Sequence, residues 1–177
     1  MPRLIVVTGC SGGGKSTLLA ELARRGHLVV EEPGRRIVHS ITDPGDPKLP
    51  WNDLEAFAKA AAALARTDYD AVRGASGPVF FDRGLVDALS ALRAASDRPI
   101  DRDMIDRYRY EEYAFFAPPW ADIWEGDTER RHGFDAACEE YERLMADYPA
   151  LGYRPIVLPK ASVTERAEFM LEEDGIP

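Results

Sequence analysis

The sequence has few cysteines and no long apolar segment, and both absences narrow the kind of protein it encodes. Only Cys10 and Cys138 occur among 177 residues, which excludes a disulfide scaffold and indicates free thiols in a reducing compartment. No apolar stretch approaches the ~20 residues that span a bilayer. The N-terminal segment MPRLIVVTG lacks the long apolar core and the small-residue cleavage site of a secretory signal. We therefore predict a cytoplasmic protein that does not cross a membrane.

Positive charge is also scarce, above all in the last third of the chain. The net charge is −9, and residues 121–177 contain 6 basic but 14 acidic side chains. Proteins hold nucleic acids and anionic membranes by neutralising phosphates with basic side chains. The charge balance therefore disfavours both partners and favours a small molecule, for which a few well-placed basic groups suffice. It leaves the oligomeric state open.

Short apolar segments alternate with helix-like segments, a pattern typical of an α/β protein with a mostly parallel sheet. We predict one domain over residues 1–177, with three α/β/α layers and five strands, at residues 4–8, 28–31, 78–81, 113–117 and 154–158. One helix is predicted over 16–25. A second begins after Asn52 as its cap and has a buried face that includes Leu54 and Phe57. A third covers 134–148, and Ser162 with Glu165 forms a capping box that opens the last.

A glycine-rich segment directly follows the first predicted strand. Residues 9–16 read GCSGGGKS and match the phosphate-loop pattern G-x-x-x-x-G-K-[ST] between a strand and a helix. The four glycines, Gly9, Gly12, Gly13 and Gly14, allow the backbone to turn its N–H groups toward phosphate oxygens. Lys15 can reach the β- and γ-phosphates and Ser16 can bind Mg²⁺. We predict that these residues and Thr17 bind ATP with Mg²⁺; the alternative is a glycine-rich turn that only joins strand to helix.

Two further motifs follow the second and third predicted strands, Glu32-Pro33-Gly34 and Asp82-Arg83. Together with the loop spacing, they resemble the Glu-Pro and Asp-Arg elements of deoxynucleoside and thymidylate kinases. A wider pattern, which includes DTERR, FDAA, LGY and LPKASVTER, is similar to predicted AAA-type ATPases related to ribosylnicotinamide kinase. The resemblance extends over nearly the whole chain and implies a P-loop NTPase fold with a lid.

The phosphate loop and the two motifs each follow a predicted strand. We therefore expect them to lie together at the carboxyl ends of the strands, where parallel sheets bind ligands. Asp82 is the candidate Mg²⁺ ligand, or else a turn aspartate. Arg83 is expected near the transferred phosphoryl group or the acceptor, or else in an ion pair with a neighbouring carboxylate. The resemblance indicates Glu32 as the general base. Alternation along a strand would turn Glu31 away from the site, but the doubled glutamate leaves the choice open, as does a structural role for Glu32 in positioning Arg35 or Arg36.

The resemblance also implies a lid over residues 121–133. Arg130 and Arg131 are the candidates that would close on the γ-phosphate, and an ion pair of either with Asp127 is the alternative. Trp51 and Phe57 are candidates for stacking on a planar acceptor, or else are core residues. Arg35 and Arg36 are candidates for an acceptor phosphate. The segment LPKAS, residues 158–162, corresponds to the adenine site of related kinases.

These observations favour an ATP- and Mg²⁺-dependent kinase that acts on a small acceptor such as a nucleoside, a nucleotide or a related metabolite. The alternative is a regulatory ATPase or GTPase without an acceptor, although no N-K-x-D guanine-reading motif is obvious. A polynucleotide kinase is disfavoured because it needs a basic channel for its substrate.

Overall fold

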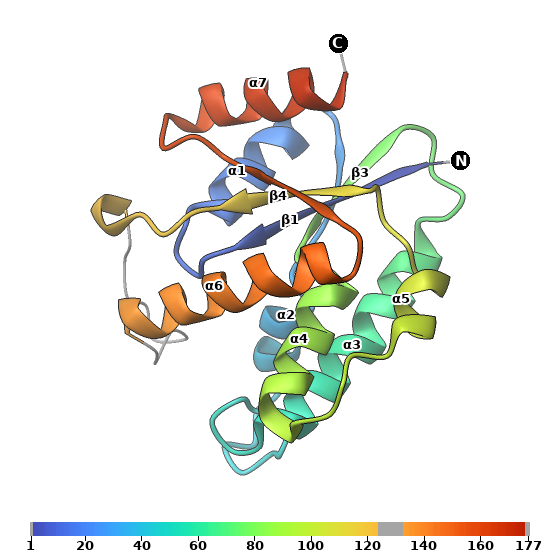
Figure 1. Ribbon diagram of the computed structural model, residues 1–177, viewed down its shortest axis with the longest axis vertical. Coiled ribbons are helices and arrows are strands. Elements are labelled where there is room, and N and C mark those ends of the chain that lie inside the picture. The colour runs from blue at the N-terminus through green and yellow to red at the C-terminus, as the bar shows by residue number, and fades with distance from the viewer. Residues whose placement is uncertain (1, 124–132, 176–177) are drawn as a thin grey trace.

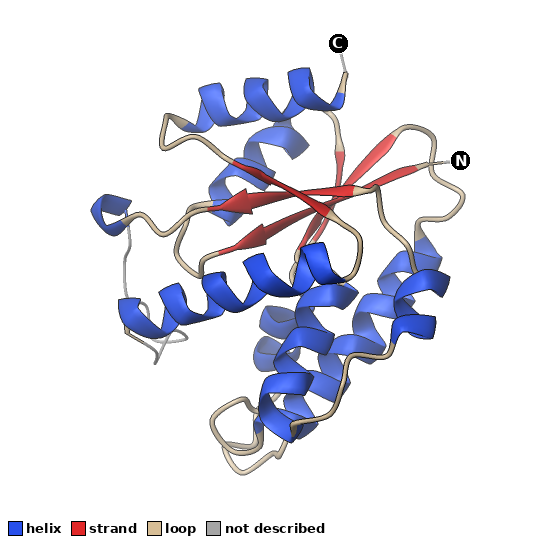
Figure 2. Cartoon of the chain, viewed as in Figure 1, coloured by secondary structure: helices blue, strands red, loops and turns tan. Residues whose placement is uncertain are grey.

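The computed structural model describes residues 2–123 and 133–175, and within these ranges five strands form one parallel sheet (Figures 1 and 2). The strands are β1 (Arg3–Gly9), β2 (Leu28–Val30), β3 (Pro78–Asp82), β4 (Tyr113–Ala117) and β5 (Arg154–Val157). Their order in the sheet is β2-β3-β1-β4-β5. Each predicted strand is present, with its ends within a residue or two of the predicted ones.

Helices cover both faces of the sheet, as predicted (Figure 1). On one face lie α1 (Lys15–Arg24) and α7 (Val163–Asp174). The other face carries α2 (Pro33–Ser40), α3 (Leu54–Ala71), α4 (Leu85–Ser96), α5 (Arg102–Arg107) and α6 (Phe134–Ala150). Successive side chains of a strand point to opposite faces. In β1, Ile5 and Val7 therefore pack with α1 and α7, while Leu4 and Val6 join the core of the other face.

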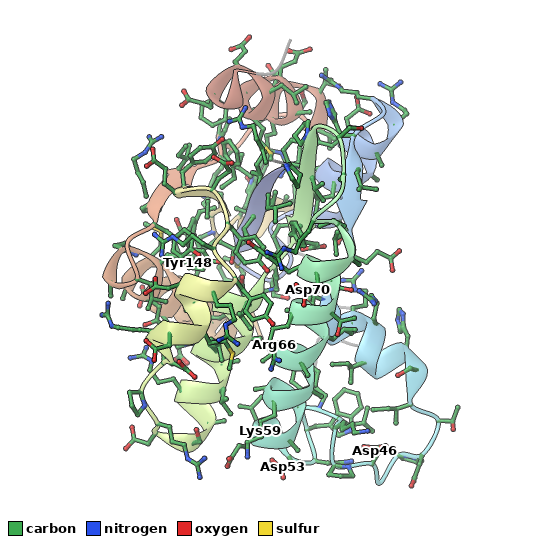
Figure 3. All side chains as sticks on the ribbon, turned by 90° about the vertical axis from the view of Figure 1, so that its right-hand side faces the viewer. Asp46, Asp53, Lys59, Arg66, Asp70 and Tyr148 are labelled. Carbon is green, nitrogen blue, oxygen red and sulfur yellow. The ribbon has the colours of Figure 1, made fainter. Side chains whose placement is uncertain are left out.

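The sequence pattern did not predict α2, α4 and α5. Helix α2 begins at Pro33, which tolerates the first helical position because the N–H it lacks would have no partner there. The predicted cap of α3 is also wrong. The Asp53 carboxylate accepts the Ala56 N–H at 3.0 Å, whereas the Asn52 amide donates to the carbonyls of Pro44 and Asp46 in the preceding loop. Figure 3 shows Asp46 and Asp53 at the same end of the molecule, far from α7.

The chain order places a crevice at the carboxyl end of β1. After β1 the chain crosses to β2 and returns through β3 on one side, whereas β4 and β5 lie on the other side. Such a reversal of direction is where α/β sheets bind ligands, and the phosphate loop follows β1 at this point. Among the helices of the described ranges, none is long and apolar enough to cross a membrane.

Candidate active site

The phosphate loop is fastened to the neighbouring strand and needs glycine at its first position. The Cys10 N–H donates to the Ala117 carbonyl at the end of β4, at 2.9 Å. Gly9 has a φ of +107°, and a Cβ atom there would lie 2.4 Å from the same carbonyl oxygen. Only glycine therefore allows β1 and β4 to lie this close at the start of the loop.

Replacing Gly9 with alanine tests this requirement. We expect Gly9→Ala to lower the free energy of unfolding by about 2 kcal/mol or more, and thus the melting temperature by about 4–8 °C. Gly74→Ala is the matched control, because a Cβ at Gly74 meets no atom within 4 Å and its φ is not positive. Thermal unfolding followed by circular dichroism measures both. Equal melting temperatures for the two variants would contradict the steric argument.

Lys15, the first residue of α1, is placed inside the loop. Its side chain is buried, and Nζ donates to the Cys10 carbonyl at 2.9 Å. Burial lowers the pKa of Lys15, and the nearby guanidinium of Arg83 lowers it further. The negative charge of Asp82 acts in the opposite direction. The amine is thus held by a carbonyl of the loop itself, in position to exchange this bond for a phosphate oxygen.

The oxygen atoms present suit a Mg²⁺ ion. Asp82, at the end of β3, is buried, and its Oδ1 has no hydrogen-bond partner among the described residues. Burial raises the pKa of Asp82, while the charge of Lys15 opposes the change. Ser16 is exposed in the first turn of α1, and Thr17 beside it donates from its hydroxyl to the Gly14 carbonyl at 2.9 Å. A hydroxyl and a carboxylate with an unused oxygen are ligands that Mg²⁺ prefers, so the residues fit the ion.

Arg83 is the charged centre of the crevice. Its Nε lies 3.4 Å from Glu32, Nη1 lies 3.3 Å from Asp87, and Nη2 lies 3.0 Å from Glu140. Burial acts to lower the pKa of Arg83, but the carboxylates, Glu140 first, hold it well above its ordinary value. The residue also has a φ of +63°, a strained conformation for a side chain with a Cβ. Arg83 therefore forms the ion pairs that were the alternative for it, and its place near the transferred phosphoryl group or the acceptor stays a prediction.

Residues behind Arg83 form a buried network that the sequence pattern did not indicate. Asp87 accepts hydrogen bonds from the Thr8 hydroxyl, from the Gly84 N–H at 2.9 Å and from the Tyr148 hydroxyl at 2.6 Å. These donors lie in β1, in α6 and in the turn before α4, so the network joins elements that are distant in the sequence. Asp87 lies four residues after Arg83, and this spacing was the one local signal for their contact.

The two glutamates lie in different surroundings, and which of them acts as the base stays a prediction. The alternation argument does not apply, because β2 ends at Val30 and Glu32 is instead the residue that precedes α2. Glu31 is exposed, whereas Glu32 is partly buried against Arg83. Glu32 makes no side-chain hydrogen bond to the helix that it precedes, so its carboxylate is directed to the crevice and not used as a cap.

A cavity of about 490 Å³ opens beside this ion-pair cluster. Glu32, Arg83 and Glu140 line it, together with Trp51, Phe57, Leu54, Ser11, Gly34, Arg35, Val38, Pro50, Ala91, Ala94, Ala136, Ala137, Glu139 and Arg143. Leu54 was expected to be buried but is 44% exposed, because it faces this cavity. Arg36 is not part of the lining and pairs with Asp68 at 2.7 Å.

A second pocket, of about 440 Å³, lies beside the loop between β5 and α7. Its lining includes Lys160, Ala161 and Ser162 of the LPKAS segment, and also Trp120, Ile123, Val163 and Arg166. Arg166 donates from Nη1 to the Gly13 carbonyl of the phosphate loop at 3.1 Å. Arg166 ends the LPKASVTER segment that carries the resemblance, but it was assigned no role, because nothing local indicates a contact with a residue 153 positions away.

The predicted lid cannot be placed. Of residues 121–133, the structure describes a short 3-10 helix at Ala121–Ile123 and then Gly133. Arg130 and Arg131 lie outside the described residues.

Kinases are among the solved structures that share this fold. Deoxyadenosine kinase from M. mycoides with bound dATP matches with a TM-score of 0.67 and 15% identity, over 98% of this chain and 99% of that chain. Shikimate kinase from Acinetobacter baumannii in complex with shikimate matches with a TM-score of 0.62 and 12% identity, over 98% and 93%. At these identities the likeness shows the fold alone. Among curated proteins the sequence has no match.

The strand order, the glycine-rich loop and the lysine at the start of α1 define a P-loop protein with the α/β fold of small kinases. Within that class, the family model described as AAA domain matches residues 4–166. The chain therefore belongs to the AAA domain family.

Proposed function

We propose that the protein is an ATP- and Mg²⁺-dependent phosphotransferase that acts on a small-molecule acceptor. The observation that carries the proposal is the cavity lined by Ser11 of the phosphate loop, Glu32 and Arg83. A regulatory NTPase needs a site for nucleotide only, whereas a kinase also needs a pocket for the acceptor within reach of the γ-phosphate. The solved structures that share the fold, deoxyadenosine kinase and shikimate kinase, are consistent with this assignment.

Each site residue has a role in this proposal. Loop N–H groups and Lys15 bind the triphosphate, and the N-terminal end of α1 adds its positive dipole. Ser16 and Asp82 hold Mg²⁺, which neutralises charge on the phosphates when bound. Glu32 accepts a hydrogen bond from the acceptor hydroxyl and orients it. Arg83, held by three carboxylates, lies beside the path of the transferred phosphoryl group.

The cavity lining favours a planar polar acceptor. Trp51 is 38% exposed and Leu54 44% exposed, and both face the cavity with the partly buried ring of Phe57. Aromatic side chains that are left accessible in a pocket can stack on a heterocycle, while Glu32 and Arg35 offer an acceptor and a donor for polar groups. A nucleoside, a nucleotide or a related metabolite has this combination of ring and hydroxyl groups.

An acceptor panel tests the function. Purified protein is incubated with Mg-ATP and single nucleosides, nucleotides and other hydroxylated metabolites, and ADP release is measured. We expect at least one acceptor to raise the rate at least tenfold above basal hydrolysis and to yield a phosphorylated product by mass spectrometry, because positioning the acceptor replaces a disordered water molecule. A rate that stays flat over the panel, with ATP bound, would overturn the kinase assignment in favour of a regulatory ATPase.

A further inference from the structure

Arg143 of α6 is a cation in the wall of the cavity proposed for the acceptor, and its hydrogen-bonding groups are only partly used. It lines this cavity together with Ala91 and Ala94 of α4, the helix that packs beside α6 (Figure 1). Its Nε–H donates to the Ser90 hydroxyl at 3.1 Å. In residues 2–123 and 133–175, neither Nη1 nor Nη2 forms a hydrogen bond or an ion pair. Four of the five N–H donors of a guanidinium are therefore available to a ligand.

A buried pair of side chains holds this guanidinium from behind. Ser90, on α4, is fully buried and donates its hydroxyl proton to Asp147 Oδ2 at 2.6 Å. The hydroxyl oxygen is thus left to accept from Arg143. Asp147 is buried as well, and its other carboxylate oxygen pairs with Arg93 at 2.7 Å. Ser90 and Asp147 therefore fix the direction of Arg143 without forming an ion pair with it.

The glutamates of the cavity do not pair with Arg143 either. Glu140 lies one helical turn before it on α6 but binds Arg83, 3.0 Å from Nη2. Burial acts to raise the pKa of Glu140, but the nearby cations, Arg83 first and Arg143 among them, hold it below its ordinary value. Glu32 also binds Arg83, and Glu139 is exposed. Among the described residues that line the cavity, Arg143 thus has no counterion of its own.

A guanidinium that is anchored through Nε and free at both Nη atoms suits an oxyanion. Two of its parallel N–H groups can bind two oxygens of one carboxylate or phosphate, and the charge strengthens both bonds. A hydroxyl or an amide carbonyl would leave the positive charge without a partner. The same cavity is lined by the rings of Trp51 and Phe57, from α3 and the loop before it. A molecule with a ring and an acid group would use both parts of the lining.

We propose that Arg143 binds a carboxylate or phosphate group of the acceptor, one that is not itself phosphorylated, and that Ser90 and Asp147 position Arg143 for this contact. The assignment rests on the proposed phosphotransferase function and narrows its acceptors to acidic ones. In that function Glu32 orients the reacting hydroxyl beside Arg83. Arg143 lies about 4.5 Å further along α6 than Glu140, the α6 partner of Arg83. The acid group is therefore separate from the group that receives the phosphoryl.

Small ring acids test the site without knowledge of the acceptor. Benzoate and phenyl phosphate each have a ring and an acid group, and benzamide is the uncharged counterpart of benzoate. With Mg-ADP present to fill the phosphate loop of the full chain, we expect at least one acid to shift the side-chain ¹⁵N resonances of Arg143. Benzamide should leave them in place, and the acid with the larger shift indicates a carboxylate or a phosphate. No shift with either acid, or an equal shift with benzamide, would overturn the proposal.

Affinities from calorimetry, with the acid that binds better, separate a contact by Arg143 from a general effect on the fold. We expect Arg143→Gln to weaken binding by about 10- to 100-fold, the range for a hydrogen bond to a charged group. Arg24→Gln is the matched control and should keep full affinity, because Arg24 is exposed on α1 and pairs with Glu21. Unchanged affinity in Arg143→Gln, or an equal loss in Arg24→Gln, would contradict the assignment.

Ser90→Ala tests the positioning role. The charge of Arg143 stays but its anchor is lost, so we expect a smaller loss of acid affinity, about 2- to 10-fold. The ¹⁵Nε resonance of Arg143 should move in the free protein, and ADP affinity should not change. If ADP affinity falls as much as acid affinity, Ser90 has only a structural role.

Matched acceptors distinguish a failure of this assignment from a failure of the proposed function. The pair uridine and orotidine differs by a carboxylate, and uridine 5′-monophosphate adds a phosphate instead. If the ring acids bind at Arg143 but no acceptor is phosphorylated, the proposed function is wrong and the anion site stands. If acceptors are phosphorylated and the uncharged ones react as fast as their acidic counterparts, the kinase function stands and the preference for acids is wrong.

Discussion

Replacing Lys15 with alanine is expected to lower ATP affinity by about 10- to 100-fold and turnover by a further ~10²- to 10³-fold. Lys15 is buried inside the loop, and its amine is held by the Cys10 carbonyl at 2.9 Å. Its loss removes a charge-assisted hydrogen bond to the bound phosphates. It also removes a charge that stabilises the developing negative charge of the transition state. Calorimetry gives the affinity, and coupled ADP release gives the turnover.

The control for Lys15→Ala is Lys59→Ala. Lys59 is an exposed lysine on α3, far from the loop, and pairs with Glu55 at 2.6 Å (Figure 3). Removing it changes the net charge by the same amount but should change neither affinity nor turnover. Unchanged ATP binding by Lys15→Ala, with the fold intact, would contradict the phosphate-loop assignment.

Replacing Glu32 with glutamine is expected to reduce acceptor phosphorylation by about 10²- to 10⁴-fold, the usual range for a positioned acid–base group. Glutamine keeps the shape of the side chain but loses the basic oxygen that orients the acceptor hydroxyl. ATP affinity and basal hydrolysis should change little, because the loop, Lys15 and Ser16 hold the phosphates. The measurement is product formation with the acceptor that the panel identifies, compared with ADP release in its absence.

Two variants separate a direct role of Glu32 from a role in holding Arg83. Glu31→Gln changes an exposed neighbour that does not line the cavity and should leave the rate unaltered. Glu140→Gln removes another carboxylate partner of Arg83, 3.0 Å from Nη2. If Glu32 acts only through Arg83, Glu140→Gln should cause a comparable loss. A larger loss from Glu31→Gln than from Glu32→Gln would reverse the choice between the two glutamates.

Local sequence was sufficient for the sheet and for the phosphate loop. The five strands are short apolar runs next to turn residues, and the three inner strands, β1, β3 and β4, are buried on both faces as is usual in a parallel sheet. The phosphate loop could be predicted from residue types at fixed spacing. Gly9, Gly12 and Gly14 have positive φ angles, which glycine adopts readily because it lacks a Cβ atom. Helices α2 and α4 were missed because Glu32-Pro33-Gly34 and Asp82-Arg83 were interpreted only as motifs that follow strands, whereas Pro33 and Gly34 are the first two residues of α2.

Tertiary structure decided which charged side chains act together. The sequence placed Glu32 and Arg83 at strand ends, and the sheet order brought these ends together. Asp87 of α4 had a local signal, because it lies four residues after Arg83, but that Glu140 of α6 completes the cluster depends on helix packing, which leaves no periodic signal in the chain. The same holds for Arg166, whose contact with Gly13 spans 153 positions. The shape of the phosphate loop follows from residues that are adjacent in sequence. The pockets on its two sides are formed by residues that are distant in sequence and become neighbours only when the helices pack on the sheet.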